Sequence, residues 1–354
     1  MDVALLGASG DCGREIAAQL VASRLLAPTE RLQLIGREGS SSARVLHGFV
    51  SDLLDAHAEY APELDVALSP EEIVADLWIV ACGATPGTDA GRGDRAMLAA
   101  ANAPIFGMYA DALARNGQGH EIVVVVSNPV ELATLLFARA VGRDRVLGIG
   151  AYQDSLRFRR EIAADLGVRR QRVSGFMIGE HGDAQMPVWS SVRVFGMEAD
   201  ELADAVTRLR AGTESHDFVA TARAETARLL GMVETGHIAE AFAEADRLPP
   251  DVRVVVRPFI THYSGSKTVR ATANATVSLV ERLLAGDDVF LAGQVLLHDG
   301  EFHGLPAVPF GVPVIASAGG IRRVVELPLT PDEEARVQSI ARVTEAKVNT
   351  WLRL

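Results

Sequence analysis

The chain has 354 residues, 48% hydrophobic and 23% charged, a composition typical of globular proteins and long enough for two domains. Its formal net charge of -12 would repel a phosphate backbone, which excludes nucleic acid as a partner. Because there are only 2 cysteines, no signal-peptide pattern and no apolar run of membrane-spanning length, we expect a cytoplasmic protein without disulfides or a membrane partner.

A glycine-rich turn begins the chain. Residues 3–6 form a short apolar run, residues 7–13 read GASGDCG, and a helical pattern covers residues 14–25. Strand, glycine turn and helix form the context of a dinucleotide-binding turn, in which bare backbone approaches a pyrophosphate at a helix N-terminus. The residues predicted to bind the dinucleotide here are Gly7, Ser9, Gly10, Asp11, Cys12 and Gly13.

The end of the next expected strand, residues 32–35, indicates which nucleotide binds. NAD-binding folds normally place an acid there, but this chain has Gly36, followed by Arg37 and three serines that begin at Ser40. A guanidinium and hydroxyls suit a ribose 2′-phosphate, so we predict NADP. If the strand ends later, Glu38 takes the role of the acid and NAD is the cofactor; this alternative stays open.

Helices and strands continue to alternate. A helix is expected over residues 44–57, and strands near residues 64–68, 77–81 and 122–126. Such alternation predicts a parallel sheet covered on both faces, hence a Rossmann-type α/β domain over residues 1–149.

Two segments at the ends of these strands are candidates for ligand binding. Residues 82–95 form a loop rich in Gly, Thr and Pro that carries Arg92 and Arg95, and we interpret it as a candidate lid. The alternative is that both arginines decorate a surface loop. Asn128 follows the strand at residues 122–126 and is expected to point into the crevice where open α/β sheets bind ligands.

The second half carries a charged pair and a histidine in a polar setting. Asp154 and Arg157 are three residues apart on an expected helix, so they share one face. His181 lies in the stretch GEHGD, where two acids favour exchange of its proton near neutral pH. Further on, residues 251–259 read as a strand or extended segment, and residues 289–297, 312–315 and 321–327 as strands of an antiparallel sheet.

Several motifs in one order resemble the lactate/malate dehydrogenase superfamily. They are the turn at residues 7–13, Asn102, SNPV at 127–130, DSLRFR at 154–159, GEHGD at 179–183, DGEFHG at 299–304 and GVP at 311–313. The end of the second strand is similar to the NADP-using, archaeal-type malate dehydrogenases. The resemblance implies that residues 150–354 form a substrate-binding α+β catalytic domain.

The resemblance also implies roles for individual residues. His181 would be the acid and base that exchanges a proton with the substrate oxygen, and Asp154 would orient its imidazole. Arg157 would bind the substrate carboxylate, Arg95 would polarise the substrate carbonyl, and Asn128 would contact the nicotinamide ribose and the substrate oxygen. The remaining cofactor positions are Gly83, Asn102, Ser127 and Asn128. No metal is implied, and homodimers or homotetramers are expected.

The loop departs from the pattern of malate-specific members. They carry a second arginine six residues before the counterpart of Arg95, where this chain has Asp89. The loop is about three residues longer, so Arg92 is a displaced equivalent, and Lys267 offers another cation. We hypothesise that Arg92 or Lys267 binds an anionic or polar distal group, and that the longer segment 208–262 remodels the outer wall of the pocket.

The predicted function is reversible NADP(H)-dependent reduction of a 2-oxo acid to a 2-hydroxy acid, malate dehydrogenase-like. Two alternatives stay open. One is the NAD-requiring glycosidase family, which shares the nucleotide fold and also binds a metal. The other is a homologue that binds a nucleotide without turnover.

Overall fold

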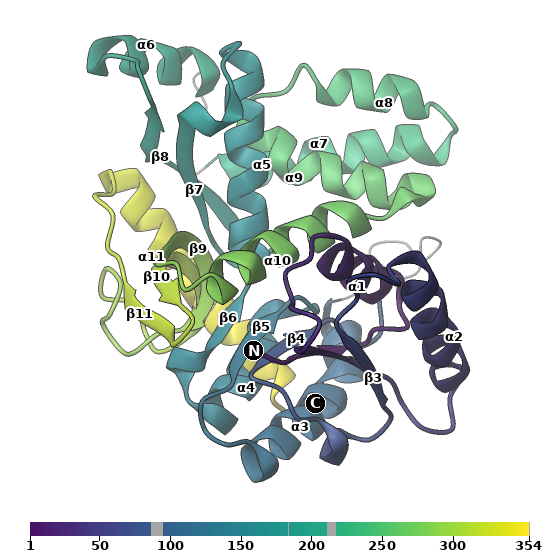
Figure 1. The fold of residues 1–354 in the computed structure, drawn as a ribbon. Helices are drawn as coiled ribbons and strands as arrows, with labels where there is room; N and C mark the ends of the chain where they lie inside the picture. Colours follow the sequence, from purple (N-terminus) through teal and green to yellow (C-terminus); the bar gives the residue numbers. More distant parts are fainter. Residues whose placement is uncertain (86–94, 183, 211–216, 354) are drawn as a thin grey trace.

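The computed structural model describes residues 1–85, 95–182, 184–210 and 217–353. Its first six strands form a parallel sheet in the order β3-β2-β1-β4-β5-β6 (Figure 1). They are β1 (Val3–Leu6), β2 (Arg31–Ile35), β3 (Glu63–Ala67), β4 (Leu77–Val80), β5 (Ile122–Val125) and β6 (Val146–Gly148). The order reverses between β1 and β4, where a doubly wound sheet opens its ligand crevice, and it confirms the predicted Rossmann-type domain.

Helices cover both faces of this sheet. They are α1 (Asp11–Ala22), α2 (Ser41–Ala56), α3 (Arg95–Asn116) and α4 (Val130–Val141), with short turns η1 (Pro70–Glu72) and η2 (Arg143–Arg145). All four residues of β1 are buried: Val3 and Leu5 pack in one hydrophobic cluster, Ala4 and Leu6 in another. A strand buried on both faces needs apolar residues at every position, which explains the continuous apolar runs of the sequence.

The second half adds antiparallel strands to the same sheet. They are β7 (Val173–Gly179), β8 (Gln185–Val194), β9 (Val289–Leu296), β10 (Pro309–Ser317) and β11 (Gly320–Val324), and β9 joins β6 through the pair Gly148 and Gln294. The helices are α5 (Gly150–Asp165), α6 (Ala199–Arg210), α7 (Phe218–Glu234), α8 (Ile238–Ala245), α9 (Pro250–Thr261), α10 (Val269–Leu284) and α11 (Pro331–Trp351), with turns η3 (Arg170–Arg172) and η4 (His262–Ser266). α5 begins at the predicted domain boundary, 149/150, which stays a prediction.

The expectation of a strand or extended segment at residues 251–259 was wrong, because these residues lie in α9. Their many valines are typical of strands, but here they pack in a hydrophobic cluster with α5 and α7. Polar anchors at the start of the helix add to this packing: Asp251 accepts a hydrogen bond from the Trp189 indole, and Arg253 pairs with Glu161 of α5. Tertiary packing thus overrides the local β propensity.

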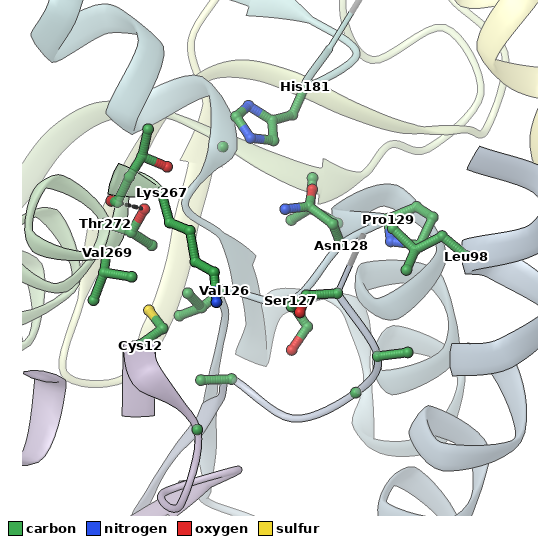
Figure 2. Close-up of a pocket in the computed structure, with 18 of the residues that line it drawn as sticks. Cys12, Leu98, Val126, Ser127, Asn128, Pro129, His181, Lys267, Val269 and Thr272 are labelled. Atoms are coloured by element: carbon green, nitrogen blue, oxygen red, sulfur yellow. Dashed lines mark hydrogen bonds between the residues drawn. The ribbon is translucent and has the colours of Figure 1, made fainter. Parts of the chain in front are cut away.

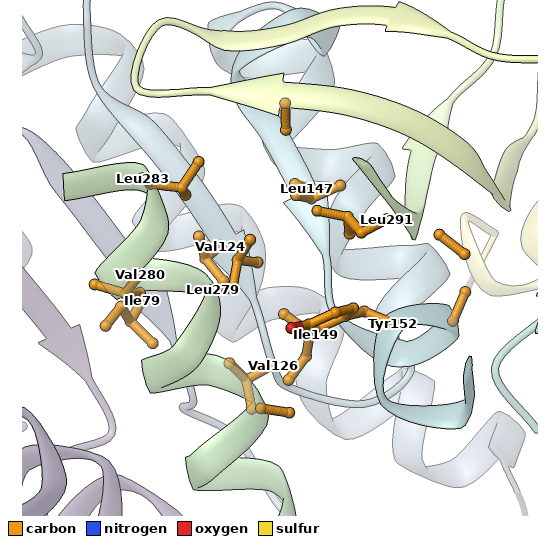
Figure 3. Packing of buried hydrophobic residues seen from close by; sticks show 14 of the residues in the cluster. Ile79, Val124, Val126, Leu147, Ile149, Tyr152, Leu279, Val280, Leu283 and Leu291 are labelled. Carbon is orange, nitrogen blue, oxygen red and sulfur yellow. The ribbon is translucent and has the colours of Figure 1, made fainter. Parts of the chain in front are cut away.

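α10 links the two halves of the core. Its Leu279, Val280 and Leu283 lie in one cluster with Ile79 of β4 and Val124 of β5 (Figure 3). The same helix packs against α1, and it leads directly from η4 beside the ligand crevice. Among the described residues, no helix combines the length and the apolarity needed to cross a membrane.

Candidate active site

A cavity of about 1350 Å³ opens at the carboxyl ends of the parallel strands. Its lining includes the residues that directly follow β1, β2, β4, β5 and β6, as the switch point of such a sheet requires. The predicted cofactor residues that line it are Gly7, Ser9, Gly10, Asp11, Cys12, Gly13, Gly36, Arg37, Ser40, Gly83, Ser127 and Asn128. The predicted His181, Asp154, Arg157, Arg95 and Lys267 also line it.

The glycine turn at the start of α1 can hold a nucleotide pyrophosphate. Gly7 has a φ of +79°, and a Cβ atom there would lie 2.5 Å from the Ala81 carbonyl oxygen. A Cβ atom at Gly13 would lie 2.2 Å from the Gly7 oxygen, so only bare backbone lets α1 approach β1 this closely. Burial raises the pKa of the neighbouring Cys12 thiol to about 11, so this side chain adds no negative charge beside a phosphate.

The end of β2 carries a glycine in tight contact with neighbouring side chains. β2 ends at Ile35, and a Cβ atom on Gly36 would lie 2.7 Å from the Leu46 methyl group. Arg37 and Ser40 line the cavity, whereas Glu38 is absent from its lining. The Arg37 guanidinium makes no hydrogen bond or ion pair to other described residues, so it is available to a ligand.

Asn102, predicted to bind the cofactor, is buried behind the residues that line the cavity, and its role stays a prediction. Its side chain is buried; Oδ1 accepts a hydrogen bond from Ala84 N–H at 2.6 Å and Nδ2 donates to the Asn128 carbonyl at 2.7 Å. A Cβ atom on Gly83 would lie 2.7 Å from Asn102 Oδ1. Asn102 therefore supports the segments that carry Gly83 and Asn128.

The predicted catalytic pair is in contact. His181 Nδ1 lies 2.8 Å from Asp154 Oδ2, and Arg157 Nη1 donates to Asp154 Oδ1 at 2.8 Å. Burial alone would raise the pKa of Asp154, which is 2% exposed, but the charges and hydrogen bonds of His181 and Arg157 outweigh burial and lower it. An ionised Asp154 accepts from Nδ1–H, which leaves Nε2 of His181 for a ligand.

Arg157 is held in a chain of hydrogen bonds on the cavity wall. With the Gln153 amide in the orientation that satisfies both its ends, its oxygen accepts from Arg157 Nη2 at 2.9 Å and from Thr272 Oγ1 at 3.0 Å. This chain connects α5 to α10 and fixes the plane of the guanidinium. Arg157 has further N–H groups, and the fixed plane of the guanidinium sets their directions. Arg157 and His181 line the same cavity.

A buried group of charges behind His181 was not found by sequence reasoning. Glu131 of α4 accepts a hydrogen bond from His181 N–H at 2.7 Å, and Arg95 donates to the His181 carbonyl at 2.6 Å. Arg95 also pairs with Glu180 at 2.8 Å, and Lys347 of α11 contacts both Glu180 oxygens at 2.9 and 2.7 Å. Burial, and secondarily the charge of Glu180, raise the pKa of Glu131 to about 7.

Of the two cations suggested as partners of a distal substrate group, Lys267 is described by the structure and Arg92 is not. Lys267 Nζ lies 2.8 Å from Asp11 Oδ2 at the glycine turn, and its side chain extends away from His181 toward Cys12 (Figure 2). Its ammonium thus has a partner on the nucleotide side of the cavity. Arg92 and Asp89, with the rest of residues 86–94, lie outside the described residues.

Described residues of the segment 208–262 line part of the cavity; that the segment is longer than in relatives stays a prediction. α7 contributes Thr226 and Leu230, and α9 contributes Val254, Pro258 and Phe259. Most of these side chains are apolar. Among the described residues, no group of three or more His, Cys, Asp or Glu side chains is arranged to hold a metal ion.

Comparison with known proteins identifies the family. The model of the lactate/malate dehydrogenase NAD-binding domain matches residues 1–148, and that of the lactate/malate dehydrogenase alpha/beta C-terminal domain matches residues 153–229. The chain belongs to the lactate/malate dehydrogenase superfamily. It is an NAD(P)-dependent dehydrogenase of 2-hydroxy acids, of the malate/lactate type.

Relatives of this dehydrogenase match over nearly its full length. The L-2-hydroxycarboxylate dehydrogenase (NAD(P)(+)) of Methanocaldococcus jannaschii is 28% identical over 342 residues, 94% of this chain and 93% of the relative. The malate dehydrogenase of Halobacterium salinarum is 28% identical over 356 residues, 98% of this chain and 97% of the relative. The lactate dehydrogenase structure of Cryptosporidium parvum shares the fold, with a TM-score of 0.76 and 21% identity over 100% of this chain and 98% of that chain.

Proposed function

We propose that this dehydrogenase catalyses the reversible NADP(H)-dependent reduction of a 2-oxo acid to a 2-hydroxy acid, with His181 as proton donor and acceptor. One observation carries the proposal: a single buried carboxylate, Asp154, contacts both His181 and Arg157 at 2.8 Å on the wall of one cavity. The shared carboxylate holds His181 and Arg157 at a fixed separation, which supports roles in proton transfer and in binding the carboxylate of a 2-oxo acid.

The residues around Asp154 have separate roles in the reaction. Arg157 binds the substrate carboxylate through parallel N–H groups and so turns the 2-oxo carbon toward the nucleotide side. His181 gives its Nε2 proton to the substrate oxygen during reduction and takes it back during oxidation, while Asp154 stabilises the charged imidazolium. The bound nicotinamide supplies or accepts the hydride. Asn128 lies near His181 on the cavity wall (Figure 2). It would contact the nicotinamide ribose and the substrate oxygen when these are bound.

Arg95 is proposed to polarise the substrate carbonyl. It lies at the first residue of α3 and already contacts the backbone of His181, beside the reacting groups. A guanidinium directed at the carbonyl oxygen stabilises the charge that develops there as hydride adds to carbon.

We propose NADP as the preferred nucleotide. Gly36 offers no carboxylate at the end of β2, and the neighbouring Arg37 and Ser40 line the cavity, where the Arg37 guanidinium makes no hydrogen bond or ion pair to a described residue. A cation and hydroxyls at this position favour a ribose 2′-phosphate. Competition between NADPH and NADH at equal concentration, with wild type and Arg37→Ala, tests this: the variant should lose the NADPH preference, and a wild-type preference for NADH would refute it.

The proposed substrate is oxaloacetate/malate or a related 2-oxo/2-hydroxy acid pair. The names of the M. jannaschii and H. salinarum relatives support this range. Arg92 remains the candidate partner of a distal carboxylate, because Lys267 is already paired with Asp11. Initial rates on oxaloacetate, pyruvate and larger 2-oxo acids, each with NADPH and NADH, test the proposal, and no turnover on any of them would favour a non-catalytic nucleotide-binding protein.

We also propose that the enzyme is a homodimer or homotetramer. The resemblance of the chain to dimeric and tetrameric dehydrogenases supports this assembly. Light scattering on the purified enzyme tests it, and a monomer at micromolar concentration would contradict it.

A further inference from the structure

The carboxylate of Glu180 needs a compensating positive charge, which the proposed chemistry does not account for. Its side chain is fully buried, and it lies directly beside the catalytic histidine in sequence. A buried carboxylate without a compensating cation is costly, so at least one positive group must stay close to it. Among the residues that the structure describes, Arg95 and Lys347 are the cations paired with it.

Both terminal nitrogens of Arg95 are engaged by groups beside His181. One of its terminal nitrogens donates to Glu180 at 2.8 Å and the other to the His181 carbonyl at 2.6 Å. To direct these N–H groups at a substrate oxygen, the guanidinium must give up at least one of these contacts. If Arg95 were the only cation, its departure would leave Glu180 as an isolated buried charge, and the ion pair would hold the arginine in place.

Lys347 provides a second positive charge for Glu180 when Arg95 moves. Its Nζ lies 2.9 Å from Glu180 Oε1 and 2.7 Å from Oε2, so it contacts both oxygens of the carboxylate. It comes from α11, which packs against α3, α4 and β7, the three elements that carry or precede Arg95, Glu131 and Glu180.

We propose that Lys347 is a positioning residue for catalysis: it neutralises Glu180 so that Arg95 can leave this carboxylate and act on the substrate. The lysine acts through Glu180 and Arg95 and touches no reacting atom. The inference rests on the proposed function, because it assumes that Arg95 polarises the substrate carbonyl. Lys347 also lies beyond residue 229, where the match to the family model of the C-terminal domain ends.

The test separates charge compensation from packing. Lys347→Met removes the charge and keeps the length of the side chain, whereas Lys347→Arg keeps the charge. We expect Lys347→Met to lower kcat roughly 10- to 100-fold, below the loss of about 10²–10³ expected when a donor to the reacting oxygen is removed in Arg95→Ala. KM should change less than kcat, and Lys347→Arg should stay near the wild-type rate.

The decisive variant is the double mutant Glu180→Gln/Lys347→Met. With the negative charge of Glu180 gone, the uncompensated ion pair that holds Arg95 is removed and its contact with the His181 carbonyl remains, so the double mutant should recover most of the kcat that Lys347→Met loses. A role of Lys347 in packing alone predicts no recovery. Arg342→Met, at an exposed position of the same helix, is the matched control and should retain the wild-type kcat.

The outcomes distinguish failure of this inference from failure of the proposed function. If Arg95→Ala lowers kcat but Lys347→Met does not, or if Glu180→Gln fails to restore a folded Lys347→Met enzyme, the role of Lys347 is refuted and that of Arg95 stands. If Arg95→Ala leaves kcat unchanged, the proposed role of Arg95 is refuted. Thermal unfolding of every variant shows whether it is folded at the assay temperature.

Discussion

The imidazole of His181 lies against the Cα atom of Gly150, at the start of α5. A Cβ atom on Gly150 would be 2.5 Å from both Cβ and Cγ of the histidine and 2.9 Å from its Nδ1. The same helix carries Asp154, which bonds Nδ1 of the ring. Gly150 and Asp154 therefore both position the imidazole, the glycine by contact and the aspartate by a hydrogen bond.

Replacing Gly150 with Ala should displace the histidine. The added methyl group overlaps the ring, and misplacement of a catalytic group by about 1 Å costs on the order of 10²-fold in rate. We expect kcat to fall 10- to 100-fold while the dissociation constant of NADPH, measured by fluorescence titration, stays the same. Gly107→Ala in α3, where the methyl group meets no atom within 4 Å, is the control. Equal rates for the two variants would contradict the packing described.

Arg157→Lys should weaken substrate binding far more than a conservative change suggests. Lysine keeps the charge but cannot donate two parallel N–H groups or bond Gln153 and Asp154 together. Loss of a buried charged hydrogen bond costs about 2–5 kcal/mol, so kcat/KM for a 2-oxo acid should fall at least about 30-fold. Steady-state kinetics measure this, with NADPH binding as the check. A kcat/KM within three-fold of wild type would show that Arg157 does not bind the carboxylate.

Glu131→Gln should change how stability depends on pH. Burial and Glu180 raise the pKa of Glu131 from 4.5 to about 7, against the opposing effects of Arg95 and His181. The folded state then binds the proton more tightly than the unfolded state, so this contribution is complete below pH 4.5 and is lost as the pH rises toward 7. At about 1.4 kcal/mol per pKa unit, the loss amounts to a few kcal/mol at most.

Glutamine still accepts the hydrogen bond from His181 N–H but does not titrate. Urea unfolding of both proteins at several pH values between 4.5 and 7.5 should therefore show a decline for wild type that Glu131→Gln lacks. Parallel stability curves for the two proteins would refute the raised pKa.

Arg253→Met should destabilise the wall formed by α9. Arg253 is buried and donates to Glu161 at 2.8 Å and to Asp165 at 2.6 Å, both on α5. Removing one partner of a buried pair leaves an uncompensated charge, which costs about 3–5 kcal/mol. Because Glu161 keeps its contact with Arg257, we expect the free energy of unfolding to fall by the lower end of this range, about 3 kcal/mol.

The exposed pair of Arg247 and Glu244 provides the comparison for Arg253. Arg247 is 74% exposed, so Arg247→Met should change the free energy of unfolding by less than about 1 kcal/mol. Urea unfolding measures both variants. Losses of similar size would show that the Arg253 network contributes no more than a surface pair.

The parts of the site that follow from local spacing were predictable. Strand, glycine turn and helix at residues 3–25 identify the nucleotide end, because the steric need for glycine is local. Asp154 and Arg157 share a helix face through their spacing of three, and the structure shows them in contact. The antiparallel strands of the second half were also confirmed at β9 and β10.

What depends on distant parts of the chain was not predictable. Lys347 and Glu180 are 167 residues apart and meet only because α11 returns to the sheet. Lys267 pairs with Asp11, 256 residues away, which no local pattern indicates. α9 was misread because its valines favour strands, while its helical state comes from packing against α5 and α7. The side-chain amide of Asn102 donates to the backbone carbonyl of Asn128, 26 residues away, which its position in the sequence also did not indicate.

The central claim is that His181 transfers the proton in an NADPH-dependent reduction of a 2-oxo acid. The most direct measurement compares single-turnover NADPH oxidation by wild type and His181→Asn on the best 2-oxo acid of the panel. Asparagine cannot donate the proton at neutral pH, so the account predicts a rate lower by about 10²–10⁴-fold with unchanged NADPH binding. A rate within a few-fold of wild type would contradict it.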